Sequence, residues 1–387
     1  MTLDRVKPLF KEIGLTRIAN VTGLDRVGIP VVSVCRPNAR SNAVCQGKGL
    51  TLEAAKASGV MESIETHCAE HIIQPLLYAS ADEMSKNKTI ADIGRLSRTS
   101  GSSLSVDTKL MWIEGRLLAD NAPCFLPFEL VHADFTVPRP PSSGNFLLST
   151  NGLASGNTVT EAILHGVCEV IERDATTLNN LNRQFDETRR LDLDSIDDGD
   201  CLTLVEMIHT ADLTLAVWDI TSDIAITTFR CQIMENARGA HAITLPAEGY
   251  GCHPNRTVAL VRAITEAAQS RVTAISGARD DMRPNLYGLG DDPTLLENWR
   301  HILKSTKGDH KFQDIQTAEL KTTDEELRLV LSKLSAAGFI DIITVDISPF
   351  PAELCAVVRV VIPGLEGPMH GAYLPGSRGL PSSRPIP

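Results

Sequence analysis

Four residues of one predicted helix have the side chains and the spacing of a ligand-binding stripe. They are Glu161, His165, Glu169 and Glu172, spaced by four, four and three residues. At 100° per residue these positions fall within about 80° of one another on one helix face. Because carboxylate oxygens suit hard cations, the stripe indicates a Mg²⁺ site. The alternative is a solvated acidic face, although no lysine is interleaved and Arg173 adjoins the stripe.

A second predicted helix repeats the arrangement. Glu62 and Glu65 are three residues apart and share a face. The loop before this helix offers the polar side chains of Arg36, Ser41 and Lys48. Gly47 and Gly49 flank Lys48, which indicates close approach of a ligand to the backbone. The loop does not match the Walker A pattern, and most Gly-Lys-Gly tripeptides are ordinary turns.

A third predicted helix carries Arg262, Glu266 and Gln269. In isolation, Arg262 and Glu266 are an i,i+4 pair, equally typical of a surface ion pair worth well under 1 kcal/mol. However, three helices that each follow a Gly-containing loop and carry charged residues can converge on one polyanion. Carboxylates would then hold Mg²⁺, while Lys and Arg side chains hold phosphates.

One motif suggests different chemistry. His67-Cys-Ala-Glu70-His71 matches His-x-x-Glu-His, the inverted zinc-peptidase pattern. Two histidines at i,i+4 with a glutamate between them can bind zinc and activate water. The match is short and needs a third ligand from elsewhere, so a polar helix end is the favoured interpretation.

The elements that must position these residues follow from hydrophobic spacing and turn signals. Helices are predicted over residues 51–73, over 157–178 with Asn157 or Thr160 as its cap, and over 257–277. Thr323 and Glu326 predict a capping box for a further helix that ends near Gly338. Strands are predicted at 29–35, within 110–135, and at 213–220, 224–234, 339–347 and 356–362, with a polar loop at 36–50. Helices and strands mix throughout, so the fold class is α/β or mixed α+β.

Composition limits the function classes. The 387 residues include 37 Lys and Arg against 48 Asp and Glu, a net charge of −11, so we expect no nucleic-acid or membrane partner. Nine cysteines, an odd number, favour a reduced, cytoplasmic protein without a signal peptide. We expect an N-terminal segment at 1–25, one domain at 26–373 with an internal boundary near 138–145, and a Pro-rich tail at 374–387.

Three stretches resemble the motifs of the YcaO family, in the family's order. The first runs from Ser41 through Gly47-Lys48-Gly49 to Glu65, the second from Asn151 through Glu161 to Asp174, and the third from Arg262 to Arg271. Residues 16–31 and 34–38 further resemble the branch of the family that works with a TfuA partner. Departures are Thr66, where many members have Arg, and Ala154, where some have Ser.

The resemblance implies a YcaO-type fold, with mixed sheets flanked by long helices and ATP between the helices, often as a homodimer. It also implies an ATP- and Mg²⁺-dependent enzyme that activates a peptide backbone amide. With sulfide as nucleophile and a TfuA partner, the product is a thioamide. With a neighbouring Cys, Ser or Thr side chain, as the proline-rich tail would favour, the product is an azoline. Either reaction needs a peptide substrate and a separate peptide-recognition protein, and a non-catalytic ATP-binding accessory protein is the alternative of another class.

The resemblance also assigns roles by position. Glu62, Glu65, Glu169 and Glu172 match Mg²⁺-binding carboxylates. The predicted nucleotide-contacting residues are Arg36, Ser41, Lys48, Asn157, Arg173, Arg262, Glu266 and Gln269. The predicted catalytic residues are Glu161, Arg173, Arg262 and Glu266.

Overall fold

The N-terminal sheet is a three-stranded antiparallel meander covered by a long helix. The computed structural model describes residues 2–182, 185–236, 245–279, 292–304, 308–369 and 371–380. The sheet contains β1 (Arg17–Asn20), β2 (Val31–Cys35) and β3 (Val44–Lys48), in that order. A short helix, α1 (Thr2–Val6), precedes it, and α2 (Leu52–Glu70) packs across β3. Thr51 caps α2 by accepting a hydrogen bond from the backbone N–H of Ala54.

The largest sheet has six antiparallel strands. Its strands are β4 (Leu76–Ser80), β6 (Lys109–Leu117), β7 (Pro123–Pro127), β8 (Leu153–Gly156), β12 (Ile343–Asp346) and β13 (Ala356–Val361). The order is β4-β6-β12-β13-β8, and β7 pairs with β6. Strands from the two ends of the chain therefore lie side by side. A short helix, α3 (Ala81–Ser85), follows β4, and β5 (Arg98–Thr99) pairs with β14 (Tyr373–Leu374) as a separate ribbon.

The third sheet is again a three-stranded antiparallel meander. It contains β9 (Leu213–Asp219), β10 (Thr228–Glu235) and β11 (Ala247–Cys252). The helices of this part are α5 (Gly199–Thr210), α6 (Arg256–Ser276) and α8 (Pro293–Lys304). Buried apolar residues of α5, α6, β9 and β10 form one core cluster on one face of the sheet.

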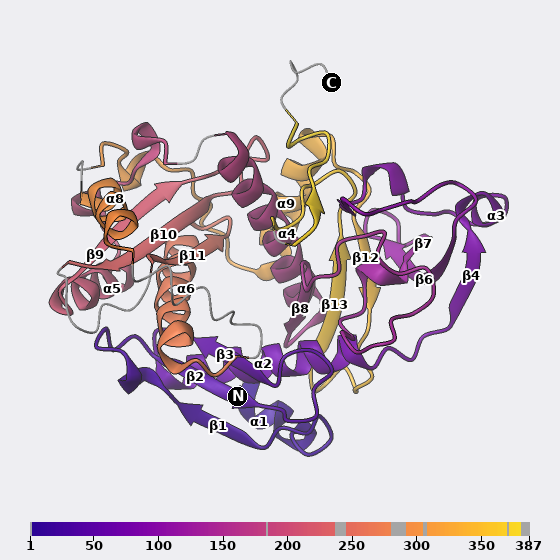
Figure 1. The fold of residues 1–387 in the computed structure, drawn as a ribbon, viewed down its shortest axis with the longest axis horizontal. Coiled ribbons are helices and arrows are strands. Elements are labelled where there is room, and N and C mark those ends of the chain that lie inside the picture. The colour runs from indigo at the N-terminus through magenta and orange to yellow at the C-terminus, as the bar shows by residue number, and fades with distance from the viewer. Residues whose placement is uncertain are drawn as a thin grey trace.

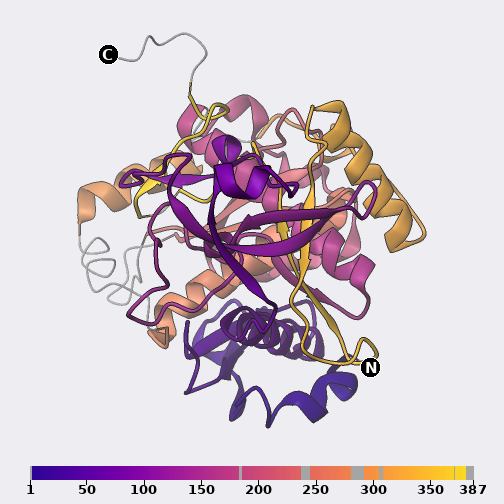
Figure 2. The same ribbon diagram turned by 90° about the vertical axis from the view of Figure 1, so that its right-hand side faces the viewer.

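A central helix, α4 (Val159–Asn182), runs between the second and third sheets, above the N-terminal layer (Figure 1). Its apolar face packs on β13 and on α9 (Thr323–Ala336), where Val167, Val358 and Val330 share a core cluster. The turned view shows the N-terminal layer lying below both other sheets (Figure 2). The polar side of α4 is therefore left facing α2 and α6.

The mixed α/β architecture agrees with the prediction, as do the three long helices, whose ends lie within a few residues of the predicted ones. The prediction of a polar loop at 36–50 was wrong in part, because residues 44–48 form β3 and pair with β2. The capping box lies one residue earlier than predicted, at Thr322 and Glu325. The sequence patterns did not predict β4, β8, β11, α5 or α8.

The glycines beside Lys48 have a packing role in the structure. A Cβ atom on Gly47 would lie 2.0 Å from the Ala55 carbonyl oxygen, and one on Gly49 would lie 2.7 Å from the Ala54 Cβ. These glycines therefore let the chain at the end of β3 approach α2 closely, and the predicted approach of a ligand stays a prediction. β1 of the predicted N-terminal segment pairs with β2, and residues 381–387 of the predicted tail lie outside the described part.

Candidate functional site

The polar stripe of α4 is partly withdrawn from water. The side chains of Glu172 and Glu169 are 5% and 19% exposed, and an oxygen of each lies 3.7 Å from a terminal nitrogen of Arg173. Burial raises the pKa of Glu172 to about 7, although Arg173 opposes the shift. Burial likewise raises the pKa of Glu169 against the opposing charges of Arg173 and Arg359. The guanidinium of Arg173 is thus shared between two carboxylates that repel each other.

The carboxylate of Glu65 reaches this cluster from α2. Its Oε1 accepts hydrogen bonds from the Ser155 backbone N–H at 2.8 Å and from the Ser155 hydroxyl at 2.7 Å. Burial raises the pKa of Glu65 to about 8, and repulsion from Glu62 and Glu169 adds to the shift. Carboxylates of α2 and α4 therefore act on one another, although the two helices are far apart in sequence.

This donor set fits a hard divalent cation. Carboxylate oxygens are the ligands that Mg²⁺ prefers, and a bound divalent charge would offset the burial and the repulsion that raise these pKa values. Of the four predicted metal ligands, Glu62 and Glu65 are on α2 and Glu169 and Glu172 are on α4. Glu62 and Glu169 both act on Glu65, and the metal role of the four residues stays a prediction.

Lys48 and Glu266 join β3 to α6 beside these carboxylates. Lys48 Nζ donates to Glu266 Oε2 at 2.8 Å. Burial would raise the pKa of Glu266, but Lys48 and Arg173 hold it below its usual value. Arg262 of α6 acts electrostatically on His165 and Glu169 of α4. Charged residues of all three long helices therefore meet around one polar space.

Two histidines border this space and are held neutral. Burial and the nearby charges of Arg262 and Lys48 lower the pKa of His165 to about 3. Burial and Arg262 lower the pKa of His253, which follows β11, to about 4. Neither imidazole adds positive charge near neutral pH.

Asn157 and Glu161 mark the beginning of α4. Glu161 Oε2 accepts from the Asn157 backbone N–H at 2.9 Å and from its Nδ2 at 3.1 Å. The amide oxygen of Asn157 accepts from the Thr2 hydroxyl at 3.0 Å, so this turn also contacts α1. Glu161 thereby fixes the side chain of Asn157 at the beginning of α4.

Three predicted nucleotide contacts have other partners in the structure. The guanidinium of Arg36 donates to Glu70 Oε2 at 2.5 Å, and the Ser41 hydroxyl donates to Glu70 Oε1 at 2.5 Å. Gln269 Nε2 donates to the Gln46 carbonyl at 2.7 Å. These contacts join α2 and α6 to the N-terminal sheet, and the predicted role of the three residues at the nucleotide stays a prediction.

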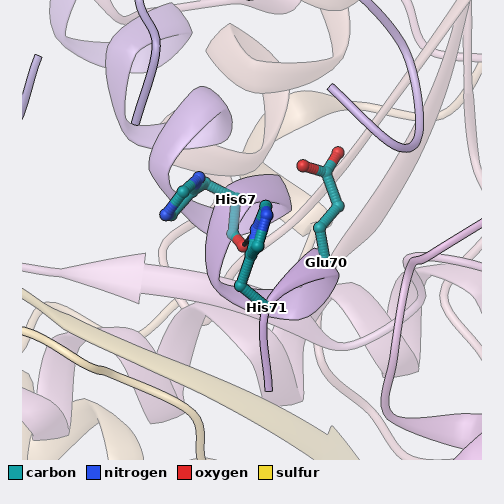
Figure 3. A group of neighbouring side chains, drawn as sticks. All are labelled: His67, Glu70 and His71. Atoms are coloured by element: carbon teal, nitrogen blue, oxygen red, sulfur yellow. Dashed lines mark hydrogen bonds between the residues drawn. The ribbon is translucent and has the colours of Figure 1, made fainter. Parts of the chain in front are cut away.

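The His67–Glu70–His71 group lies at the end of α2 (Figure 3). One potential ligand atom from each residue lies within 4.8 Å of the others. However, Glu70 already binds the buried guanidinium of Arg36, whose Nη2 also lies 3.4 Å from His67 Nδ1. A metal ion would have to displace or approach this positive charge, so the geometry favours a structural role for the group.

Two residues of the polar region were missed by the sequence reading. Ser155 lies within the second predicted motif but was assigned no role, and its hydrogen bonds to Glu65 depend on the pairing of β8. Arg359 was not identified, although an arginine in the centre of Val357-Val-Arg-Val-Val361 is an evident signal in an otherwise apolar strand.

A family model described as "YcaO cyclodehydratase, ATP- and Mg²⁺-binding" matches residues 46–366. The chain belongs to the YcaO family. This match covers all three predicted motifs except the beginning of the first, and it confirms the predicted family and the predicted cofactors, ATP and Mg²⁺.

Relatives of this YcaO protein match over nearly its whole length. It is 35% identical over 385 residues to an uncharacterized protein in the tfuA 3′ region of Rhizobium leguminosarum bv. trifolii, covering 96% of this chain and 89% of that protein. It is 32% identical over 372 residues to an uncharacterized protein of Methanothermobacter thermautotrophicus, covering 94% and 93%.

Solved structures share the YcaO fold at lower identity. The structure of YcaO from Methanopyrus kandleri bound with AMPPCP and Mg²⁺ has a TM-score of 0.73 and 20% identity, covering 94% of this chain and 90% of that one. A heterocyclase in complex with substrate and cofactor has a TM-score of 0.75 and 20% identity. The match covers 95% of this chain and 52% of the heterocyclase chain. At this identity these matches establish the fold.

No helix among the described residues combines the length and the hydropathy that a bilayer-spanning segment needs.

Proposed function

We propose that this YcaO protein activates a peptide backbone amide with ATP and Mg²⁺ and, together with a TfuA-like protein, converts it to a thioamide. The observation that carries the thioamide assignment is the 35% identity, over 96% of this chain, to a protein in a tfuA 3′ region. The peptide is a ribosomally made substrate, held by a separate recognition protein. Nine free cysteines suit a reducing compartment, and we place the reaction in the cytoplasm.

The polar space between the three helices is the proposed nucleotide site. Glu62, Glu65, Glu169 and Glu172 would hold Mg²⁺, which would neutralise charge on the phosphates. Lys48, Arg173 and Arg262 supply positive charge to the phosphates. Glu266 orients Lys48 through their 2.8 Å contact, and Glu161 holds the Asn157 amide toward the nucleotide.

The proposed chemistry conserves atoms and charge. Hydrosulfide adds to the amide carbonyl carbon, forming the C–S bond and moving the C=O electron pair onto oxygen. That oxygen attacks the γ-phosphorus of ATP and displaces ADP. The C–O bond then breaks, phosphate leaves, and loss of the sulfur proton gives C=S. Phosphorylation converts a poor leaving group into a good one, which explains the need for ATP.

A second candidate is azoline formation from a neighbouring Cys, Ser or Thr side chain. The description of the family model as a cyclodehydratase supports it. Both reactions share the ATP-dependent step and differ in the nucleophile. A third candidate, a non-catalytic ATP-binding accessory protein, would bind ATP and modify no peptide.

The first experiment measures ATP binding by calorimetry with and without Mg²⁺. We expect Mg²⁺-dependent binding by the wild type, at least tenfold weaker binding by Glu169→Gln and Lys48→Gln, and unchanged binding by the controls Glu53→Gln and Lys56→Gln. The two control residues form an ion pair with each other on the outer side of α2, and Glu53 is 71% exposed. Equal binding by Glu169→Gln and the wild type would refute the site assignment.

The second experiment distinguishes the products. Peptides from cells that produce the wild type or Glu172→Gln, each with the TfuA-like protein, are compared by mass spectrometry. Replacement of oxygen by sulfur in a backbone amide supports thioamidation. Loss of one water per modified residue supports the azoline, and no wild-type-specific peptide change supports the accessory role.

A further inference from the structure

A buried arginine lies inside the six-stranded sheet, and the assignments above give it no role. Arg359 of β13 is 2% exposed. Its Nη2 donates to the Ser149 carbonyl at 2.5 Å, whereas within the described part of the chain Nε and Nη1 have no hydrogen-bond partner. Burial lowers the pKa of Arg359 to about 10, and Glu169 favours its charged form. A buried charge with unpaired donors is costly, so a ligand is expected to complete its hydrogen bonds.

Arg359 lines a cavity of about 50 Å³. Ser97, Ser149 and Asn151 also line it, and the exposed Arg95 lies on its wall, so the cavity reaches the surface. The buried Oδ1 of Asn151 has no donor among the described residues. Because amide oxygen and nitrogen are assigned rather than observed, a rotated Asn151 amide would add a second donor. A water molecule needs only about 10–15 Å³ of such space, so the cavity has room for a small ion.

The cavity adjoins the carboxylate cluster. Val170, which follows Glu169 on α4, lines it too. In antiparallel register, Val357 opposes Ser155 and Arg359 opposes Leu153, so Arg359 and Ser155 are on the same face of the sheet. Ser155 is the residue that binds Glu65 on this face. The guanidinium is therefore on the same face of the sheet as Ser155, which holds Glu65, whereas α4 packs on the opposite face through Val358.

We propose that the cavity around Arg359 binds a small monovalent anion, and that hydrosulfide is the anion it holds during the reaction. The second half of this inference rests on the proposed function. A guanidinium stabilises hydrosulfide relative to neutral hydrogen sulfide, so the site would keep sulfur in its nucleophilic form beside the activated amide. Chloride has the same charge and a similar size, and it would occupy the site when sulfide is absent.

The test uses bromide as the probe, without ATP or Mg²⁺. Wild-type crystals soaked in sodium bromide are expected to show an anomalous peak within hydrogen-bond reach of Arg359 Nε or Nη1. Arg359→Met should lack the peak, and Arg359→Lys, which keeps charge but loses the fork of donors, should bind about tenfold more weakly. The control Arg328→Met, at an exposed position of α9, should keep it.

Solution measurements complete the test. Bromide should raise the wild-type Tm above that in sodium gluconate at equal ionic strength, and Arg359→Met should lose this difference. Absence of both the peak and the Tm difference would overturn the anion site, as would a peak that persists in Arg359→Met, which would be an adventitious ion only. Sodium hydrosulfide should displace bromide. Failure to do so would overturn the hydrosulfide assignment, and neither result depends on whether ATP binds.

Discussion

At the scale of single residues, the site carries an electrostatic cost in the metal-free protein. The pKa values of Glu65 and Glu172 lie near 8 and 7, above the ordinary value of 4.5, so the folded state holds protons that the unfolded state has released. The free energy of unfolding therefore falls as the pH rises from about 4.5 to 8, by about 1 kcal/mol or more per carboxylate. We expect the metal-free Tm to fall over this range and Mg²⁺ to reduce the fall.

The double variant Glu65→Gln/Glu172→Gln isolates this effect. Glutamine keeps the shape and removes the titrating group, so the Tm of the double variant should change less between pH 5 and pH 8. Glu53→Gln should keep the wild-type slope, because Glu53 is exposed. Differential scanning calorimetry in chelator measures both slopes. A double variant as pH-sensitive as the wild type would contradict the assigned cause.

Most of the predicted site residues were identified from their types and their spacing along the predicted helices. The Glu169 and Glu172 stripe follows from helical periodicity, which depends only on nearby sequence. The contact between Lys48 and Glu266, 218 residues apart, depends on how β3 and α6 pack, and helical spacing does not encode it. Arg359 differs from both cases. An arginine within an apolar strand is visible in the sequence, but its burial follows from the position of β13 within the sheet.

At the scale of elements, glycines set the distance between two of the long helices, α2 and α6, and the strands they cover. Gly47 lies against α2, and Gly249 lies against α6, where an added Cβ would be 2.2 Å from the Ala263 carbonyl oxygen. Both helices thus approach a strand backbone closely. This packing explains why β3 and β11 escaped prediction, since their small and polar residues have low strand propensity and only the tertiary fold makes them strands.

Gly47→Ala tests this role. Its Cβ would lie 2.0 Å from the Ala55 carbonyl oxygen and 2.1 Å from the Gly59 nitrogen, so α2 must move away from β3. We expect a loss of about 2–4 kcal/mol in unfolding free energy and weaker ATP binding, because Glu62 and Glu65 move with the helix. Gly199→Ala at the beginning of α5 has no atom within 4 Å and should leave both unchanged. Chemical denaturation and calorimetry measure the two effects.

At the scale of the whole molecule, one arginine joins the C-terminal segment to two distant parts of the chain. Arg378 donates to both carboxylate oxygens of Asp174 on α4, at 3.0 and 2.9 Å, and to Asp223 at 2.6 Å. The side chain of Asp174 is fully buried, and Arg378 is 16% exposed. The contact lies one residue beyond Arg173, so it holds the C-terminal segment against the helix that carries the carboxylate stripe.

Arg378→Met should leave the Asp174 carboxylate buried, with the Glu366 backbone N–H as its remaining donor among the described residues. Breaking one side of a buried ion pair costs more than removing both sides, because the remaining charge keeps its desolvation penalty. We expect Arg378→Met to lower the free energy of unfolding by about 2–3 kcal/mol. The double variant Arg378→Met/Asp174→Asn should recover at least half of this loss. Chemical denaturation of the wild type, both single variants and the double variant gives the coupling energy. If the double variant is no more stable than Arg378→Met, the stability of the C-terminal segment does not depend on neutralising Asp174.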